Sequence, residues 1–101
     1  MANYLIAKIS ITDREEYKLY EAGFIEIFSA YKGKMLAVDE SVKLLEGEWP
    51  VTRTVLIEFP SEEDAMDWYT SEEYQQLAKH RFASSQGDIV LVHGIEPIEE
   101  R

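Results

Sequence analysis

The 101-residue sequence predicts one α+β domain with the element order strand, helix, strand, strand, helix, strand. Two patterns lead to this order: short segments in which apolar and polar residues alternate, as in half-buried strands, and segments in which apolar residues recur every three or four positions, as on one face of a helix. In addition, each helical segment follows a residue that favours helix initiation. Four strands and two helices in this order are typical of a ferredoxin-like βαββαβ sandwich, in which both helices cover one face of an antiparallel sheet.

The first half of the chain contains the first helix and two of the strands. Residues Asn3 to Ile11 alternate in hydrophobicity and predict a strand. Asp13 is the expected N-cap of a helix ending near Gly33, because aromatic and apolar residues then recur at helical spacing: Tyr17, Tyr20, Phe24, Ile27, Phe28 and Tyr31. Lys34 to Val38 predict a short strand, and in the irregular segment that follows, Val42 to Leu45 are a candidate for an extra edge strand.

The second half begins with the strongest strand pattern in the chain, Val51 to Phe59. Two short helices, or one broken helix, follow it. Their core faces are expected to carry Ala65, Trp68 and Tyr69 in the first and Tyr74, Leu77, Ala78, Arg81 and Phe82 in the second. The last strand is expected over Asp88 to Gly94. We therefore predict a single domain over residues 1–95 and a polar tail over residues 96–101.

The stretch SEEDAMDWYTSEEY, residues 61–74, contains six carboxylates in fourteen residues. Ser61 precedes Asp64, and Thr70 precedes Glu73, at the spacing of a capping box, with carboxylates in the first turn where the helix dipole favours negative charge. The alternative is a site for a hard cation, but calcium sites require a spaced loop with a turn glycine, which this stretch lacks. The pattern predicts two helix starts, and we expect no metal site.

Both faces of the predicted strands carry apolar side chains, although a ferredoxin-like sheet has helices on only one face. The opposed sets are Val55 and Ile57 against Leu56, Val90 and Val92 against Ile89 and Leu91, and Leu5 and Ile9 against Ile6. Soluble monomers rarely leave a large apolar patch exposed, so we expect two copies to pack sheet to sheet into a dimeric α/β barrel. The alternative is a monomer with a mixed second face.

Composition excludes several classes of function. The formal charge of −10 disfavours binding to nucleic acid or to anionic membranes. The absence of Cys excludes thiol catalysis, disulfides and thiolate metal sites. No phosphate loop, dinucleotide fingerprint or nucleophile triad is present, so we expect no cofactor. Without a membrane-length apolar stretch or a leader pattern, the chain is expected to be soluble and cytoplasmic.

Several stretches resemble a known family when taken together. They are Asp13 with Tyr17 and Tyr20, YKGK at 31–34, LEG at 45–47, and TRTVLIEFPSEEDAMDWYTSEEYQQLAKHR at 52–81. The chain resembles the "domain of unknown function 1330" family of the dimeric α/β-barrel superfamily, over nearly its whole length. The resemblance implies a homodimer and no settled reaction, while the wider superfamily includes cofactor-independent oxygenases, isomerases and stress-response proteins. The chain departs from the family pattern at Lys34, Asp39 and Glu40.

Arg53 is the first candidate for a ligand-binding cation, because an arginine on an otherwise apolar strand needs a carboxylate, a carbonyl or a ligand anion. The alternative is a salt bridge at the surface or at an interface. Arg81 follows Tyr74 by about two helical turns on the same face and would add a second positive group. The phenols of Tyr17, Tyr20, Tyr69 and Tyr74 are candidates to line a cavity, or else they are core side chains whose hydroxyls find local partners.

Asp13 and Glu58 are the candidates for a catalytic acid or base, although the sequence gives no geometry that joins them. His80 and His93 lack the spacing of helical metal ligands and are interpreted as core or interface residues. The resulting hypothesis is a homodimer that binds a small, partly apolar, carboxylate-bearing compound, either as a binding protein or as a cofactor-independent isomerase or oxygenase. The alternative is a non-catalytic stress-response or interaction protein whose aromatic residues only fill the core.

Overall fold

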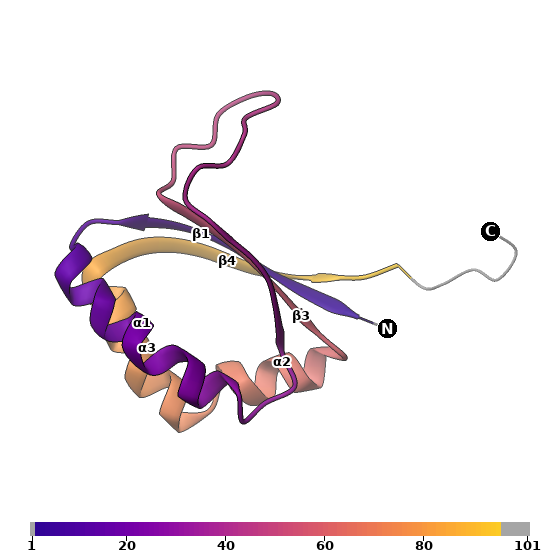
Figure 1. Cartoon of the computed structure of the whole chain (residues 1–101). Helices are drawn as coiled ribbons and strands as arrows, with labels where there is room; N and C mark the ends of the chain where they lie inside the picture. The colour runs from indigo at the N-terminus through magenta and orange to yellow at the C-terminus, as the bar shows by residue number, and fades with distance from the viewer. Residues whose placement is uncertain (1, 96–101) are drawn as a thin grey trace, which may run out of the picture.

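The computed structural model describes residues 2–95, so the predicted tail, residues 96–101, lies outside the described residues. In chain order the elements are β1 (Asn3–Ile11), α1 (Arg14–Phe28), β2 (Lys34–Asp39), β3 (Arg53–Phe59), α2 (Glu62–Tyr69), α3 (Glu72–Ser84) and β4 (Ser85–His93). The strands form an antiparallel sheet in the order β2-β3-β1-β4. All three helices lie on one side of this sheet (Figure 1). The predicted α+β ferredoxin-like fold is confirmed.

The two central strands, β1 and β3, supply the floor of the core. Their side chains alternate between buried and half-buried positions, as the period of two in the sequence predicts. The buried members face the helices: Leu5, Ala7 and Ile9 from β1, and Val55, Ile57 and Phe59 from β3. Register places Leu5 opposite Ile57 and Ala7 opposite Val55, so these side chains form rows across the sheet on one face.

Side-chain caps fix where the helices begin. At the start of α1, Asp13 accepts a hydrogen bond from the backbone N–H of Glu16, with a distance of 3.2 Å to Oδ1. At the start of α2, Ser61 Oγ accepts one from the N–H of Asp64 at 3.1 Å. The first half of the carboxylate-rich stretch therefore initiates a helix, as its spacing predicts.

The second predicted cap is wrong by one residue. Thr70 ends α2, and its hydroxyl donates back to the carbonyl of Met66 at 2.6 Å. Since that hydroxyl is engaged, Ser71 is the N-cap of α3 and accepts from the N–H of Tyr74 at 3.2 Å. The stretch still contains two helix starts.

Helix α1 ends at Phe28, five residues before the predicted end at Gly33. Its last turn closes when the N–H of Ser29 donates to the carbonyl of Ile25 at 2.9 Å. Gly33 has another role, because a Cβ at that position would lie 2.5 Å from Phe28 Cζ and 2.7 Å from Phe59 Cε1. The glycine lets the chain enter β2 directly beside the aromatic core.

Phe82 was predicted to lie in the core, and His80 and His93 in the core or an interface; all three lie outside the core. Phe82 is 55% exposed because it lies off the buried helical row of α3, which consists of Tyr74, Ala78, Arg81 and Ser84. His80 Nδ1 lies 2.6 Å from a carboxylate oxygen of Glu16, and His93 Nε2 lies 2.9 Å from one of Glu62. Neither imidazole belongs to the core.

The face of the sheet away from the helices has an apolar centre. Register places Ile6 of β1 between Leu56 of β3 and Val90 of β4, and Val90 and Val92 are exposed. Lys8 lies opposite Asp88 on the same face. The predicted apolar character of both faces is therefore present. We call this surface the open face.

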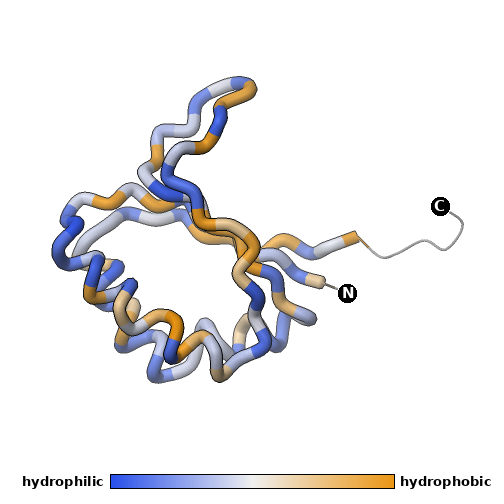
Figure 2. The backbone as a smooth tube through the Cα atoms, in the orientation of Figure 1, coloured by the Kyte–Doolittle hydropathy of each residue, from blue (hydrophilic) through white to orange (hydrophobic). Residues whose placement is uncertain are grey.

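The segment 40–52 connects β2 to β3 without regular secondary structure, so the extra strand predicted at Val42–Leu45 is wrong. The segment stands out from the sheet (Figure 1) and has no strand of its own chain with which to pair. Trp49 ties its base to the open face, because Nε1 donates to Thr54 Oγ1 at 2.9 Å and the Lys8 ammonium lies 4.5 Å from the ring centroid. Apolar and hydrophilic residues alternate along its outer part (Figure 2), and Leu45 is 83% exposed.

Candidate functional site

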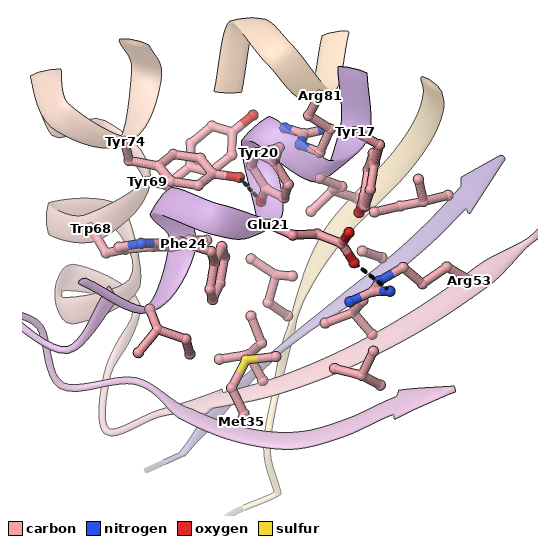
Figure 3. A pocket seen from close by; sticks show the side chains of 18 residues that line it. Tyr17, Tyr20, Glu21, Phe24, Met35, Arg53, Trp68, Tyr69, Tyr74 and Arg81 are labelled. Atoms are coloured by element: carbon pink, nitrogen blue, oxygen red, sulfur yellow. Dashed lines mark hydrogen bonds and ion pairs between the residues drawn. The ribbon is translucent and has the colours of Figure 1, made fainter. Parts of the chain in front are cut away.

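A cavity of about 230 Å³ lies between the helix layer and the sheet (Figure 3). Strands β1, β3 and β4 supply its apolar floor, while the helices supply rings and most of its polar groups. The lining residues are Leu5, Ala7, Ile9, Tyr17, Tyr20, Glu21, Phe24, Ile25, Met35, Val38, Arg53, Val55, Ile57, Trp68, Tyr69, Tyr74, Arg81 and Ile89. The site is thus an apolar chamber with a few polar groups, which is the usual composition of a small-molecule pocket.

The helices present their aromatic side chains to one another across this chamber. Trp68 and Tyr74 have ring centroids 4.2 Å apart, and Tyr20 and Tyr74 have theirs 6.2 Å apart. Tyr17 stacks at a tilt on Tyr20 at 5.4 Å. The spacing of three and four residues that predicts α1 therefore also places its rings on the cavity wall.

Arg81 lies at the inner end of the cavity and is only 4% exposed. Its Nε and Nη2 atoms are buried and have no hydrogen-bond partner among the residues that the structure describes. The guanidinium carbon lies 5.8 Å from the Tyr20 ring centroid and 4.9 Å from that of Phe82. Ring faces stabilise this cation in part but supply no hydrogen-bond acceptor in the plane of the guanidinium.

Burial acts to lower the pKa of Arg81, but the neighbouring phenols of Tyr74 and Tyr20 outweigh it and the pKa is raised. The side chain is therefore a permanent cation in a mostly apolar chamber. Gly87 of β4 lies beside it, and a Cβ there would be 3.5 Å from Arg81 Nη1, in ordinary contact. A larger side chain at that position would crowd the guanidinium.

The hydroxyls of Tyr20 and Tyr74 lie 2.8 Å apart, close to Arg81. Only one of the two O–H groups can donate within the pair, so the other proton remains to be donated elsewhere. Burial, followed by the proximity of Tyr74, raises the pKa of Tyr20 well above its usual range. The Tyr20 phenol is hence neutral at physiological pH, and the inner end offers a hydroxyl donor.

The mouth of the cavity contains a cluster of charged side chains from α1, β3 and the segment after β2. Arg53 Nη1 lies 3.1 Å from a carboxylate oxygen of Glu21 and 2.9 Å from one of Glu40. Arg14 binds both oxygens of Glu40, at 3.0 and 3.2 Å. Hydrogen bonds from Arg14 and Arg53 lower the pKa of Glu40. The charges of two arginines and two glutamates thus cancel at the mouth.

Tyr17 separates the mouth from the inner end. Its ring centroid lies 5.7 Å from the guanidinium carbon of Arg53, and the ring stands between the two arginines (Figure 3). Burial raises the pKa of the Tyr17 phenol, against the opposing effect of Arg53. The two cations of the cavity therefore have distinct surroundings.

The structure brings six of the predicted site residues together. The ligand-binding candidates Arg53, Tyr17, Tyr20, Tyr69, Tyr74 and Arg81 all line the cavity. The two catalytic candidates do not line it. Asp13 caps α1, and Glu58 alternates with the buried residues of β3, so it belongs to the open face. Arg53 has the salt bridges that sequence reasoning gives as the alternative to a ligand, and the roles of all these residues remain predictions.

Sequence reasoning missed Glu21, the one carboxylate among the described lining residues. It follows Tyr17 by four residues, so the helical face that identified the tyrosines also contains it. Trp68 was identified as a core residue, but its Nε1 is also buried without an acceptor among the described residues. An indole nitrogen without a partner leaves no signal in a sequence.

Two features are absent from the part of the chain between residues 2 and 95. In that part, no three His, Cys, Asp or Glu side chains group in a way that would hold a metal ion. Likewise, none of its helices has the length and apolar character that crossing a membrane requires.

Comparison with known families confirms the resemblance seen in the sequence. The family described as "Domain of unknown function (DUF1330)" matches residues 2–95. No curated protein matches the chain.

Solved structures share the fold at low sequence identity. A protein of unknown function from Rhodopseudomonas palustris is 16% identical with a TM-score of 0.78, covering 95% of this chain and 84% of its own. SnoaB, a cofactor-independent oxygenase from Streptomyces nogalater, is 12% identical with a TM-score of 0.65, covering 96% of each chain. A dimeric ferredoxin-like protein of unknown function from Thermobifida fusca is 12% identical with a TM-score of 0.66, covering 90% of this chain and 89% of its own. At these identities the likeness extends to the fold alone.

Proposed function

The chain belongs to the DUF1330 family, and from this premise and the chemistry of its cavity we propose that it binds a small, largely apolar molecule bearing one carboxylate. Arg81 receives the carboxylate at the inner end. The tyrosine pair Tyr20 and Tyr74 donates its free proton to the same group, while Tyr17 and Tyr69 flank the apolar body of the ligand.

The observation that carries this proposal is the buried guanidinium of Arg81, whose Nε and Nη2 have no hydrogen-bond partner among the described residues. Leaving a buried donor unsatisfied costs about 1–3 kcal/mol, and more when the group is charged. A ligand carboxylate would offset this cost, because its two oxygens match the planar donor fork of an arginine. Arg53 is less suited to the role, since two glutamates already provide its acceptors.

The dimensions of the cavity limit the ligand. Pockets for drug-sized compounds occupy roughly 300–1,000 Å³, and this cavity has about 230 Å³. Its walls are largely rings, with Phe24 and Trp68 beside the tyrosines. A compound of one ring or of a short branched chain fits this volume and favours contact with ring faces.

A catalytic form of the proposal is a cofactor-independent oxygenase or isomerase. SnoaB is described as a cofactor-independent oxygenase, and the present chain shares its fold. In such a reaction Arg81 would stabilise negative charge that develops on a substrate oxygen. Glu21, as the described carboxylate of the cavity, is the candidate for proton transfer.

The test compares two arginine variants with an aromatic monocarboxylate as the probe. We expect 4-isopropylbenzoate to bind the wild-type protein in titration calorimetry and to raise its melting temperature. Arg81→Gln should weaken binding by about 30-fold or more, because truncating one partner of a buried charge pair costs about 2–5 kcal/mol. Arg53→Gln is the matched control and should change the affinity by less than about fivefold, since the glutamates satisfy that arginine.

Two results would contradict the proposal. One is the absence of saturable binding for every member of a panel of aromatic and aliphatic monocarboxylates. The other is the reverse ranking, in which Arg53→Gln abolishes binding and Arg81→Gln does not. That ranking would make Arg53 the ligand-binding cation.

We further propose that the protein is a homodimer that packs through the open face. The apolar centre of that face, with exposed Val90 and Val92, needs a cover, and the dimeric protein from Thermobifida fusca has the same fold. Sedimentation velocity should give a dimer for the wild type and a particle of 11.7 kDa for Val90→Lys. A wild-type particle of 11.7 kDa at micromolar concentration would overturn the dimer.

An interaction protein without a ligand is the second candidate. The observation that favours it is the exposed segment 40–52, in which Leu44 and Leu45 are 53% and 83% exposed. Under this alternative the cavity binds no monocarboxylate, and substitutions in the segment change association while substitutions at Arg81 do not.

A further inference from the structure

The mouth of the cavity contains a feature that monocarboxylate binding alone does not require, namely a carboxylate among its lining residues. Glu21 lies on α1 one helical turn after Tyr17 and lines the cavity together with Arg53. Its side chain is 36% exposed, so it lies between solvent and the ring-lined interior. Any molecule that extends from Arg81 toward the mouth approaches this carboxylate.

The charges around the cavity can be counted by region. At the mouth, Arg14 and Arg53 are matched by Glu21 and Glu40 through contacts of 2.9 to 3.2 Å. At the inner end, Arg81 has no carboxylate partner among the described residues. The cavity therefore has one uncompensated positive charge, on Arg81, and Glu21 binds the other arginine, Arg53.

From this arrangement we propose that Glu21 is a specificity residue that restricts the cavity to monoanions, so that a second negative group on the ligand is rejected at the mouth. The inference rests on the proposed function, because it takes Arg81 as the site of the first carboxylate. It goes beyond that function by naming the ligand class and the residue that sets it.

The physical reason is repulsion in a poorly hydrated space. A dianion with one carboxylate on Arg81 places its second charge near Glu21, where apolar walls reduce screening. Arg53 offsets this charge only in part, because Glu21 and Glu40 share its Nη1 atom, at 3.1 and 2.9 Å. Two like charges brought together in a binding interface cost several kcal/mol. Such a contact is a usual way for a binding site to reject the wrong ligand.

Glu21 and Glu40 provide a matched pair for testing this role. Both bind Arg53, at 3.1 and 2.9 Å, but only Glu21 lines the cavity. Removing either charge leaves the mouth with one net positive charge. Only the removal of Glu21 also deletes the negative group that faces the ligand.

The experiment uses two probes of nearly equal shape, 4-isopropylbenzoate and benzene-1,4-dicarboxylate, in titration calorimetry with the full chain. The wild-type protein should bind the monoanion at least tenfold more tightly than the dianion. Glu21→Gln should reduce this ratio at least tenfold, mainly through tighter binding of the dianion. Glu40→Gln should reduce it by less than about threefold. Circular dichroism and the melting temperature confirm that each variant is folded.

Different results overturn different parts of the proposal. If the monoanion binds in an Arg81-dependent way but Glu21→Gln leaves the ratio unchanged, the selection by Glu21 is wrong and the proposed function stands. If Glu40→Gln changes the ratio as much as Glu21→Gln does, the net charge of the mouth sets the preference for monoanions, and Glu21 has no special role. If the wild-type protein binds neither probe, both the proposed function and the selection are overturned.

Discussion

The two arginines of the cavity lie on either side of Tyr17, yet their environments are opposite. Arg53, at the mouth, has two carboxylates within 3.1 Å. Arg81, at the inner end, is almost completely buried, and its Nε and Nη2 have no partner among the described residues. A paired cation at the edge of a site holds chain segments together, whereas an unpaired cation inside a site remains available to a ligand.

The same contrast applies to the walls around each arginine. Near the inner end, aromatic rings pack on one another, and Trp68 and Tyr74 are each at most 2% exposed. At the mouth, Ile25 and Val38 are largely exposed although they line the same cavity. Stability is therefore concentrated at the inner end, and the mouth can tolerate change.

The largest expected effect tests this distribution of stability. Trp68→Ala removes a fully buried ring and should lower the free energy of unfolding by about 3–5 kcal/mol. Ile25→Ala, at a position that is 63% exposed, should change it by less than about 0.5 kcal/mol. Chemical denaturation at pH 7 measures both values. Similar losses for the two variants would contradict the division into a packed inner end and a permissive mouth.

A smaller effect with opposite signs is expected at the two arginines. Arg81→Met replaces an unpartnered buried charge with an apolar chain of similar length and should raise the free energy of unfolding of the empty protein by about 1–2 kcal/mol. Arg53→Met removes two ion pairs and should lower the free energy of unfolding by about 1 kcal/mol or less.

Chemical denaturation of the two methionine variants against the wild-type protein decides this prediction. A loss of stability in Arg81→Met would mean that Arg81 is a structural residue, since a group kept for a ligand destabilises the empty protein. The proposed function would then lose the observation on which it rests.

The sequence predicted the fold well because periodicity and capping residues act locally. The alternation from Asn3 to Ile11 and the Ser61 cap are visible in a few neighbouring letters, and both are present in the structure. The extra strand at Val42–Leu45 failed because pairing depends on a neighbouring strand edge, which local sequence does not specify. The predicted cap at Thr70 is wrong because a hydroxyl between two helices can bond to the end of the first or to the start of the second. The Thr70 hydroxyl bonds to the carbonyl of Met66, in the first.

The site was predicted only as a set of residues. Helical spacing placed the tyrosines and Arg81 on the correct face, and all of them line the cavity. The sequence ranked Arg53 first as the ligand-binding cation, because an arginine on an otherwise apolar strand needs a partner. Its partner Glu40 comes from an irregular segment whose position depends on the whole fold, so local sequence does not show that Arg53 is already paired. The proposed function therefore ranks Arg81 above Arg53.

The smallest expected effect concerns the pH dependence of the mouth. Hydrogen bonds from Arg14 and Arg53 lower the pKa of Glu40 in the folded protein below its value of 4.5 in the unfolded chain. The resulting stabilisation is fully present above pH 4.5 and is lost as the pH falls through the lowered pKa. The difference in unfolding free energy between the wild type and Glu40→Gln should therefore be constant from pH 7 to pH 5 and shrink toward pH 3.

Arg81→Met provides the contrast for this measurement. Within residues 2–95, Arg81 has no carboxylate partner that could titrate, so the difference between the wild type and Arg81→Met should stay constant over the same acid range. Denaturation curves at pH 7, 5, 4 and 3 for the three proteins measure both differences. A constant difference for Glu40→Gln would mean that the mouth cluster does not couple to folding. An acid-dependent difference for Arg81→Met would mean that Arg81 interacts with a carboxylate after all, and the contrast between the two arginines would be lost.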